Sequence, residues 1–438
     1  MGATIPTALP RSRPRGFGGW TRWQLAALLV WLVVFVVGLQ GVSDRLASGS
    51  QQTDLGSYNP WGLWVSSYIW FIGLSAGSFL LSTLVYVFRI RQLERVAPLA
   101  LFVALVTLFM ALLMIWFDIG HMDRFLEVYL RPQFNSAMAW MVWLYTTYFL
   151  LLIVETYLVL RPRLVAQAQA PGLSGSLARV LVAGRRTPLT DGERAGGQRA
   201  ILILGAVGIP LAVAFHGGVG ALFATVDARD VWHSALYPIL FLVGALFSGG
   251  ALFTGLVAFV WPSRDEHWRS TVRLLGWITL GLLLLEALLD WADLSVPLWY
   301  RIGTDVSALE YLLTGPFWWV FWIVQVGLGL VVPAALLVWG RRSPQVIGAA
   351  GLLAGVVFLG ARLNLVLPGF VSPELQGLQL SYHDGRLLYQ YVPTWPEWEL
   401  VAFVIAVGVA LFAIGIWLLP ILSGTDIPAP QTSEGDPR

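Results

Sequence analysis

Long apolar segments alternate with short polar ones along the whole chain. A helix that crosses a bilayer needs about 20 mostly apolar residues. Segments of that kind lie at about 23–42, 60–88, 97–120, 137–160, 200–224, 234–261, 272–293, 316–339, 346–367 and 398–421. The pattern therefore predicts an all-α integral membrane protein with about ten transmembrane helices, whose solvent is the lipid bilayer.

The composition supports this class and excludes some chemistry. Hydrophobic residues make up 57% of the chain and charged residues 12%, about half the charged fraction of soluble domains. The 22 tryptophans and 45 glycines suit interfacial aromatic belts and close helix packing. Because the chain has no cysteine, it cannot ligate an iron–sulfur cluster through thiolates or attach a c-type haem through CxxCH. We expect no nucleic-acid partner.

The arginines predict the orientation. All 27 positively charged residues are arginine. If the N-terminus is inside, the inner segments hold 20 arginines and the outer loops hold 6, and Arg362 lies within a span. The positive-inside rule then places both termini in the cytoplasm. The first apolar segment follows several arginines, as in a signal peptide, but it is long for one, so we expect a retained anchor.

A weak internal repeat runs through the chain. "WFIGLSAGSFLLSTLVYVF" and "FLVGALFSGGALFTGLVAF" align at an offset of 173 residues. Both would enter from the same side, as parallel repeats do, although small-residue packing alone could produce the likeness. The expected organisation is a cytoplasmic N-terminus, anchor helix and outer loop (1–57), a first four-helix bundle with an inner loop at 161–199 (58–225), a second four-helix bundle (226–368), an outer loop and last helix (369–422), and a disordered cytoplasmic tail (423–438).

Ionisable residues gather at the predicted outer ends of the segments. Four of the five histidines are on or toward that side, and His267 is inside. The outer group contains His121, His216, His233, His383, Asp118, Asp123, Arg124, Asp227, Arg229, Asp230, Asp290 and Asp293. We therefore expect any chemistry on the outer side of the membrane.

The stretch "FDIGHMDRF" (117–125) places an acid beside a histidine at the end of an apolar segment. Asp118 and His121 are three residues apart, so they share a face if the helix continues, and Arg124 follows three residues later. A carboxylate beside a histidine at a dry boundary is suited to accept protons. The alternative is helix capping with a salt bridge to Arg124.

Other polar residues lie deeper in the apolar segments. His216 is about 13 Å from the outer end of its segment at 1.5 Å per residue, where it needs a partner or a ligand. The alternative is a core histidine bonded to a backbone carbonyl. Tyr68 could bond a ligand oxygen. Glu155, Glu286 and Arg362 could form a proton route or structural pairs.

Several stretches together resemble the NrfD / polysulfide-reductase membrane-subunit family. They are "WGLWVSSYIWFIGLSAGSFLL", "FDIGHMDRF" followed by "NSAMAWMVWLY", and "HGGVGALFATVDARDVWHSALYPILFLVGALFSGGALF". "RLNLVLPG" followed by "YVPTWPEWELVAFVIAVGVALFAIGIWLLP" is similar to the long, ten-helix branch. The resemblance covers roughly residues 58–422.

The resemblance implies a haem-free subunit in a prokaryotic cytoplasmic membrane. Such a subunit exchanges electrons between a quinone pool, menaquinone or ubiquinone, and an extrinsic ferredoxin-like iron–sulfur subunit on the outer face. A further catalytic or cytochrome subunit would complete the oxidoreductase, and the chain would not be catalytic alone. The quinone site would lie in the first bundle. One short-form branch holds the quinone with a histidine where this chain has Tyr68.

By that resemblance, Asp118 and His121 match the acidic end of the third helix and His216 matches the histidine of the fifth. The other polar candidates are assigned roles from their positions in the sequence. Asp118 and His121 would handle protons as catalytic residues. Quinone binding is expected at Tyr68, Trp61, His216, Gly77 and Arg124. A possible proton path contains Glu155, Asp227, His233, Asp290, Asp293 and Arg362. No residue is expected to bind a metal.

Other functions stay open at this point. A b-type cytochrome anchor could use His216 and His233 as haem ligands, although the two lie at different depths. A secondary transporter or proton channel would fit the repeat and the buried charges, but the inner halves of the spans offer few polar residues besides Glu155. An absorption spectrum and uptake in liposomes would distinguish these functions. An inert anchor would contain no quinone after purification.

Overall fold

The computed structural model describes residues 21–185, 187–226, 229–300, 305–371, 373, 377–381, 384, 387 and 389–422. The described residues form helices and no strand. Ten helical segments are long and apolar enough to cross a membrane. They are α1 (Arg22–Ser48), α2 (Leu63–Tyr86), α3 (Ala97–Asp118), α5 (Ala137–Gln167), α7 (Asp191–Ala224), α8 (Tyr237–Val260), α9 (Glu266–Tyr300), the π-helix η5 (Val320–Val331) with α11 (Val332–Trp339), α12 (Pro344–Val357) with α13 (Leu359–Val366) and α14 (Pro368–Val371), and α16 (Trp395–Leu418). The prediction of an all-α, multi-pass membrane protein with ten spans is confirmed.

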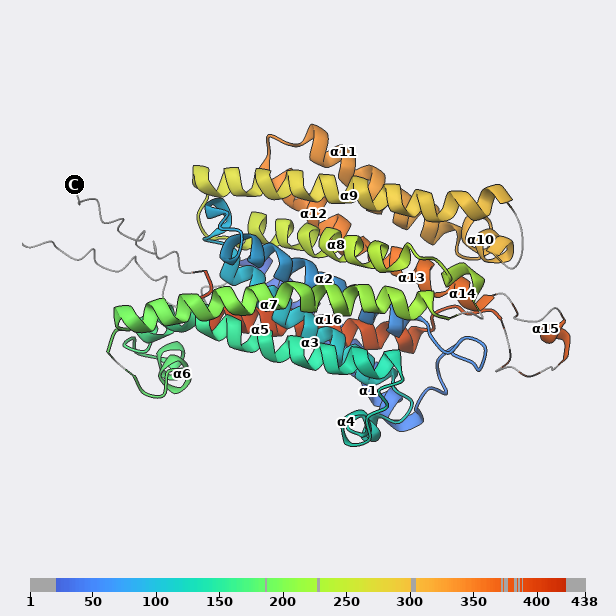
Figure 1. The fold of residues 1–438 in the computed structure, drawn as a ribbon, viewed down its shortest axis with the longest axis horizontal. Helices are drawn as coiled ribbons and strands as arrows, with labels where there is room; N and C mark the ends of the chain where they lie inside the picture. Colours follow the sequence, from blue (N-terminus) through green and yellow to red (C-terminus); the bar gives the residue numbers. More distant parts are fainter. Residues whose placement is uncertain are drawn as a thin grey trace, which may run out of the picture.

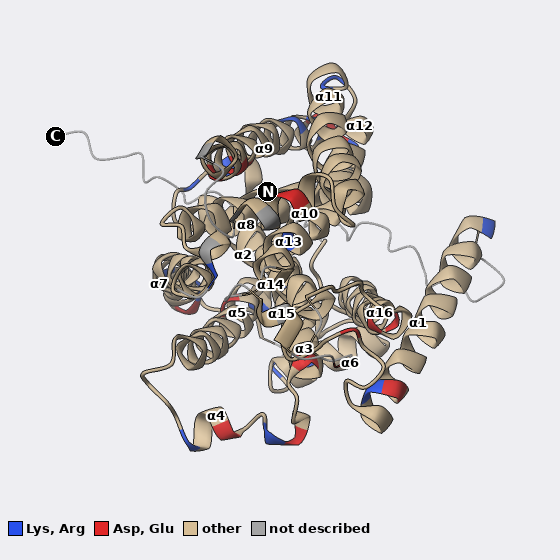
Figure 2. Ribbon diagram, turned by 90° about the vertical axis from the view of Figure 1, so that its right-hand side faces the viewer, with Lys and Arg blue, Asp and Glu red and all other residues tan. Residues whose placement is uncertain are grey.

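The long helices run alongside one another, so that the molecule has two ends (Figure 1). The α6 end carries the surface helix α6 (Leu173–Leu181). The α4 end carries the short helices α4 (Glu127–Leu130), α10 (Asp305–Leu313) and α15 (Leu378–Ser381). Charged residues are sparse along the helices and appear mainly near their ends and in loops (Figure 2). The α4 end corresponds to the predicted outer side, which stays a prediction.

Two sets of helices contact each other at the centre. α2, α3, α5 and α7 form one set of neighbours, which we call the first bundle. α8, α9, η5 with α11, and α12 with α13 form the second bundle. The bundles meet where α2 and α7 contact α8. α1 and α16 pack against each other beside α3, and Trp31 donates from Nε1 to the Ala406 carbonyl at 2.9 Å.

The α2–α8 crossing explains the small residues of the internal repeat. A Cβ at Gly77 would lie 2.1 Å from the Ala245 carbonyl oxygen and 2.8 Å from the Gly249 α-carbon. Gly77 and Gly249 belong to the two stretches that the repeat aligns. The aligned stretches are therefore in direct contact, with room only for glycine at this point.

Two helices extend beyond the predicted ends of their spans. Thr190 and Glu193 form a capping box at the start of α7, and Arg185 donates to the Glu193 carboxylate. α5 also continues to Gln167. The predicted loop at 161–199 is thus too long, and only residues 168–190 separate the two helices. The short surface helix expected within it is present as α6. The predicted tail 423–438 lies outside the described residues.

Candidate functional site

The α4 end of α3 places Asp118 at the edge of the helical core. α3 ends at Asp118, because Ile119 is extended (φ −60°, ψ 125°). Asp118 Oδ1 is buried and accepts no hydrogen bond from any described residue. Asp118 and His121 would share a helix face only if the helix continued, and it ends at Asp118.

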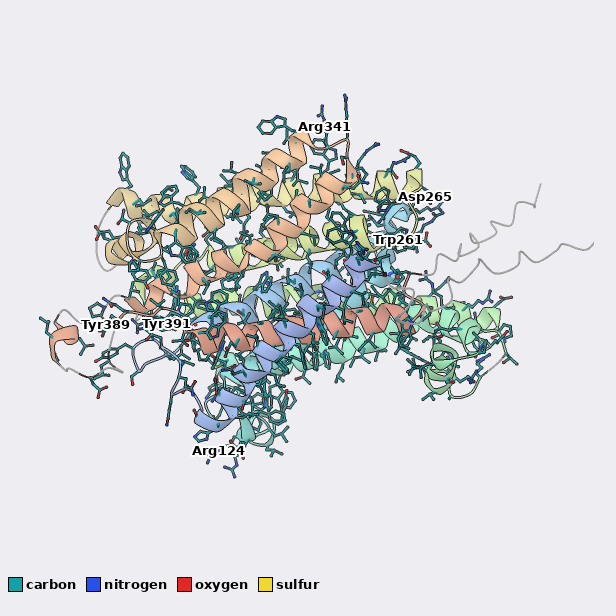
Figure 3. The ribbon with its side chains drawn as sticks, turned by 180° about the vertical axis from the view of Figure 1, so that it is seen from behind. Arg124, Trp261, Asp265, Arg341, Tyr389 and Tyr391 are labelled. Carbon is teal, nitrogen blue, oxygen red and sulfur yellow. The ribbon has the colours of Figure 1, made fainter. Side chains whose placement is uncertain are left out.

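His121 and Arg124 lie on the surface instead. His121 precedes the single turn η3 (Met122–Arg124) and Arg124 ends it, and their side chains are 73% and 66% exposed. His121 Nδ1 is 3.9 Å from Asp123 Oδ1, and Arg124 Nε is 4.0 Å from Asp123 Oδ2. Figure 3 shows Arg124 at the edge of the molecule, away from the helical core. Exposed ion pairs of this kind contribute little to the stability of the folded state.

Arg45, at the end of α1, holds the end of α3. Its Nε donates to the Phe117 carbonyl at 2.7 Å and its Nη2 to the Ile119 carbonyl at 2.8 Å. The side chain is buried, and the guanidinium carbon lies 5.6 Å from the centre of the Trp64 ring. These carbonyls have no helical partner of their own, and a cation is favourable at a helix C-terminus. Asp118 therefore sits between two anchored backbone groups.

A second charge reaches the same region from α16. The Glu397 carboxylate accepts from the Tyr391 hydroxyl and from the backbone N–H of Asp54 at 3.1 Å. Tyr391 accepts in turn from the Leu63 N–H at 2.8 Å, which joins the start of α2 to this network. Burial, and then the neighbouring Glu397, raise the pKa of Tyr391 well above its usual range. Among the described residues, Arg45 and Glu397 are charged groups close enough to act on Asp118.

Sequence reasoning missed Arg45 and Glu397. Arg45 was counted with the outer loops, although it occupies the last turn of an apolar helix, where it can bond carbonyls. Glu397 stands three residues after Thr394, and that spacing is the sequence signature of a capping box, which the structure shows.

Tyrosines line the interior beside Asp118. Tyr68 on α2 contacts Tyr145 on α5 edge to face at 5.9 Å between ring centres. Phe215 on α7 packs against Tyr145 at 5.4 Å and Tyr148 at 4.7 Å. The Tyr145 and Tyr148 hydroxyls are buried and make no hydrogen bond within the described chain. Asp118 is within electrostatic range of Tyr68.

His216 lies next to this group without belonging to it. It is fully buried, and neither ring nitrogen has a hydrogen-bond partner among the residues described. The expected alternative, a bond to a backbone carbonyl, is not found there. Phe215, not His216, contacts the tyrosines, and the charge that acts on His216 is Arg362 of the second bundle. His216 therefore belongs to the junction of the two bundles.

Trp61 and Gly77 have packing partners. Trp61 stacks on Trp232 at 5.9 Å and meets Phe223 and Phe370 edge to face. Gly77 faces the α8 backbone, so no space for a ligand remains on that side. Contacts between helices thus account for the presence of Trp61 and Gly77. The positions of these two side chains do not support the expected contact with quinone.

The expected proton-path residues do not form one line. Glu155 on α5 is fully buried, and its two oxygens have no hydrogen-bond partner in the described ranges. Asp290, Asp293 and Arg362 line a cavity in the second bundle. His233 is exposed near η4 (Asp230–Trp232). Asp227 lies outside the described residues, and so does His383.

The described residues contain no group of three or more histidine, cysteine, aspartate or glutamate side chains arranged to hold a metal ion. His216 and His233, the pair considered for a haem, differ in burial, since the first is fully buried and the second exposed. The chemical groups at the α4 end of the first bundle are therefore the carboxyl group of Asp118, the tyrosine hydroxyls and the buried guanidinium of Arg45.

Comparison with known proteins gives consistent relatives. The chain is 36% identical over 395 residues to a selenate reductase subunit of Mesobacillus selenatarsenatis, covering 89% of this chain and 92% of the relative. It is 26% identical over 397 residues to the Hdr-like menaquinol oxidoreductase integral membrane subunit of Archaeoglobus fulgidus, covering 88% of each. It is 22% identical over 421 residues to the menaquinone reductase integral membrane subunit of Nitratidesulfovibrio vulgaris, covering 92% and 94%.

A family model described as "Polysulphide reductase, NrfD" matches residues 51–374, which is most of the chain. The matched range includes α2, with Tyr68, and the end of α3, with Asp118. The long relatives extend the similarity to nearly the whole chain. This protein belongs to the NrfD family of polysulphide reductase membrane proteins.

Proposed function

We propose that this chain is the quinone-reactive membrane subunit of a multi-subunit respiratory oxidoreductase in a prokaryotic cytoplasmic membrane. Two of its relatives have menaquinol or menaquinone in their names, and a third is a subunit of a reductase. The observation that carries the proposal is Asp118 Oδ1, a buried carboxyl oxygen without a hydrogen-bond partner in the described structure, on a side chain in electrostatic range of Tyr68.

The residues at the α4 end fit a quinol ring. When bound, a quinol supplies two electrons and two protons as it becomes the quinone, and the reverse reaction takes up the same number. Asp118 is the group placed to accept or donate a proton. The hydroxyls of Tyr68 and Tyr145 are the candidates to bond a quinol oxygen, and Tyr145 has no other partner within the described chain. His216 is a weaker candidate, because Phe215 contacts these tyrosines in its place.

Arg45 would act as a positioning residue. Its hydrogen bonds to the carbonyls of Phe117 and Ile119 fix the backbone on both sides of Asp118. It is also a positive charge within range of Asp118. A fixed carboxyl group near a cation and a dry interior is suited to exchange protons with a substrate.

The electrons would pass to an extrinsic iron–sulfur subunit. This chain has no cysteine, so such clusters would be on a partner, which we place at the α4 end on the outer face. The surface between α3 and α5 supports that position, because it exposes large apolar side chains beside charged ones. Its exposed apolar residues are Phe125, Leu126, Leu130 and Phe134. His121, Asp123 and Arg124 would then contact the partner or conduct protons to water.

A proton route toward the α6 end would use α5. Tyr145, Tyr148 and Glu155 lie on this helix at spacings of three and seven residues, so they follow one face. Each has a buried oxygen without a hydrogen-bond partner in the described part of the chain. In the second bundle, Asp290, Asp293 and Arg362 could form a separate route.

The function can be tested on the complex purified through a tag on this chain. We expect a cysteine-rich iron–sulfur subunit to co-purify, and the complex to oxidise menadiol or reduce menadione with an artificial redox partner. The chain purified alone should bind the quinone analogue without turnover. A complex that lacks a cysteine-rich subunit, or that reacts with neither form of the analogue, would contradict the proposal.

A further inference from the structure

A cavity of about 370 Å³ lies between α9, η5 and the α12–α13 segment of the second bundle. This volume is within the roughly 300–1,000 Å³ of typical small-molecule sites. Its walls are mostly apolar, and they include the buried Phe247 and Phe358. Trp291 and Trp322 also line it and are 66% and 50% exposed. The cavity therefore reaches from the core to the surface that faces lipid.

The polar groups of this cavity gather on one side. Glu286 is 4% exposed, and its Oε2 has no hydrogen-bond partner among the described residues. Asp290 accepts from Gln325 Nε2 at 3.1 Å, and Gln325 accepts from Asn364 Nδ2 at 2.7 Å. Glu286, Asp290 and Gln325 all line the cavity. Arg362 is a charged neighbour of Glu286, but Glu286 Oε2 lacks a hydrogen bond within the described chain. A buried polar atom without a hydrogen bond is costly, so a hydrogen-bonding ligand would be stabilised here.

A smaller cavity continues the polar side. It has a volume of about 60 Å³, shares Glu286, Asp290 and Gln325, and adds Arg362 and Asn364. The guanidinium of Arg362 lies over the rings of Phe241 at 5.0 Å and Phe358 at 4.6 Å. Its Nε and Nη2 are buried without a hydrogen-bond partner in the part of the chain that the structure describes. The polar side of the two cavities thus presents hydrogen-bond donors on Arg362 and an acceptor on Glu286.

The π-helical geometry of η5 adds an independent observation. π-Helices are rare, are mostly single turns and are frequent at functional sites. η5 is longer than that, since it extends over 12 residues. Phe321, Gln325 and Gly329, at intervals of four, all line the cavity. Gln325 is the polar residue of this face, and it links Asp290 to Asn364. The unusual helix therefore presents one polar group at the polar side of an apolar cavity.

We propose that this cavity is a second ligand site, which takes an uncharged ring compound with hydroxyl or carbonyl groups and an apolar tail, as quinols and quinones are. The ring would lie among the aromatic walls and its oxygens would meet Glu286 and Gln325, with the tail leaving past Trp291 and Trp322 into lipid. Two carboxyl groups disfavour a phosphate headgroup. This second site would bind the same class of ligand as the proposed site at Asp118, and no turnover is assigned to it.

A photoreactive azido-naphthoquinone tests the site in the purified complex. We expect cross-links in peptides of α9 and η5, in addition to those near Asp118 and Tyr68. Leu294→Trp fills the cavity and should reduce the α9 and η5 cross-links about tenfold, since a factor of ten corresponds to only about 1.4 kcal/mol. Ala287→Phe is a second filling variant in case the first does not assemble. Leu288→Trp is the control, because Leu288 is exposed on the same helix and does not line the cavity.

Each outcome distinguishes the two sites. Cross-links near Asp118 alone overturn this inference and leave the proposed function intact. Cross-links in α9 and η5 alone support the inference and contradict the first-bundle site. If a diazirine phospholipid labels the buried cavity residues Phe247 and Phe358, and menadione does not displace this labelling, the cavity holds an acyl chain and the inference is wrong. Equal loss of labelling with Leu294→Trp and Leu288→Trp also overturns it.

Discussion

Arg45 donates a hydrogen bond from Nε to the Phe117 carbonyl at 2.7 Å, so the last turn of α1 holds the last turn of α3. A second bond, from Nη2 to the Ile119 carbonyl at 2.8 Å, fixes the other side of Asp118. A flanking helix that the sequence presents as a simple anchor therefore orients the acid at the centre of the proposed site.

Replacement of Arg45 should affect both stability and quinol chemistry. Hydrogen bonds from charged groups contribute about 1.5–3 kcal/mol each, so we expect Arg45→Gln to lower the free energy of unfolding by about 3 kcal/mol. Arg45→Lys should restore part of the stability, because it keeps the charge but bonds fewer carbonyls. Thermal unfolding and menadiol oxidation in the purified complex measure the two effects. Arg22→Gln, on the exposed other end of α1, is the control, and an equal loss there would contradict the assignment.

The α2–α8 crossing should not tolerate a methyl group. In Gly77→Ala the new Cβ would approach the Ala245 oxygen to 2.1 Å, and overpacking of this kind costs about 1–3 kcal/mol. The matched substitution Gly281→Ala meets no atom within 4 Å and should be neutral or stabilising by up to about 1 kcal/mol. Unfolding temperatures in detergent test the difference. Equal temperatures for the two variants would show that the crossing is looser than the structure indicates.

The Tyr391–Glu397 contact should give stability a dependence on alkaline pH. Tyrosine in an unfolded chain titrates near about pH 10, and burial together with Glu397 raises the pKa of Tyr391 well above that. Above about pH 10 the unfolded chain has lost the proton that the folded protein keeps, so stability falls as pH rises. Tyr391→Phe should lower stability at neutral pH and reduce the slope above about pH 10. A variant curve parallel to the wild-type curve would contradict this contribution.

The tyrosines and His216 should differ in their effect on quinol affinity. Loss of one hydrogen bond to a ligand costs about 1–2 kcal/mol, so we expect Tyr145→Phe to raise the KM for menadiol about tenfold with a smaller change in kcat. His216→Gln should leave the KM within about threefold, because the residue of α7 whose ring packs against Tyr145 and Tyr148 is Phe215. A larger rise in KM for His216→Gln than for Tyr145→Phe would show that His216, and not Tyr145, binds the quinol.

Apolar periodicity predicted the spans well, because a span must be about 20 apolar residues long whatever its neighbours are. The ends were less predictable. α7 begins at Asp191 and not near 200, since the Thr190–Glu193 cap and Arg185 extend it beyond the apolar segment. α3 ends at Asp118. The spacing of residues in the sequence does not distinguish a helix that ends there from one that continues to His121.

Part of the candidate site could be proposed from the sequence alone. Asp118 and Tyr68 could be identified, since polar groups stand out in an apolar sequence. Arg45 and Glu397 depend on contacts between α1, α3 and α16, which are far apart in the chain. The direction of His216 depends on whether it or Phe215 faces α5, and one residue of rotation decides that.

The central claim is that Asp118 handles the protons of quinol oxidation or quinone reduction. Asp118→Asn keeps the size of the side chain and removes its acid–base function, and Asp191→Asn makes the same change on an exposed acid at the start of α7, away from the proposed site. Menadiol turnover by the purified complex, measured across pH, is the direct test. Asp118→Asn should lower turnover about a hundredfold or more, while Asp191→Asn keeps the wild-type rate. Full turnover with Asp118→Asn in an assembled complex would contradict the account.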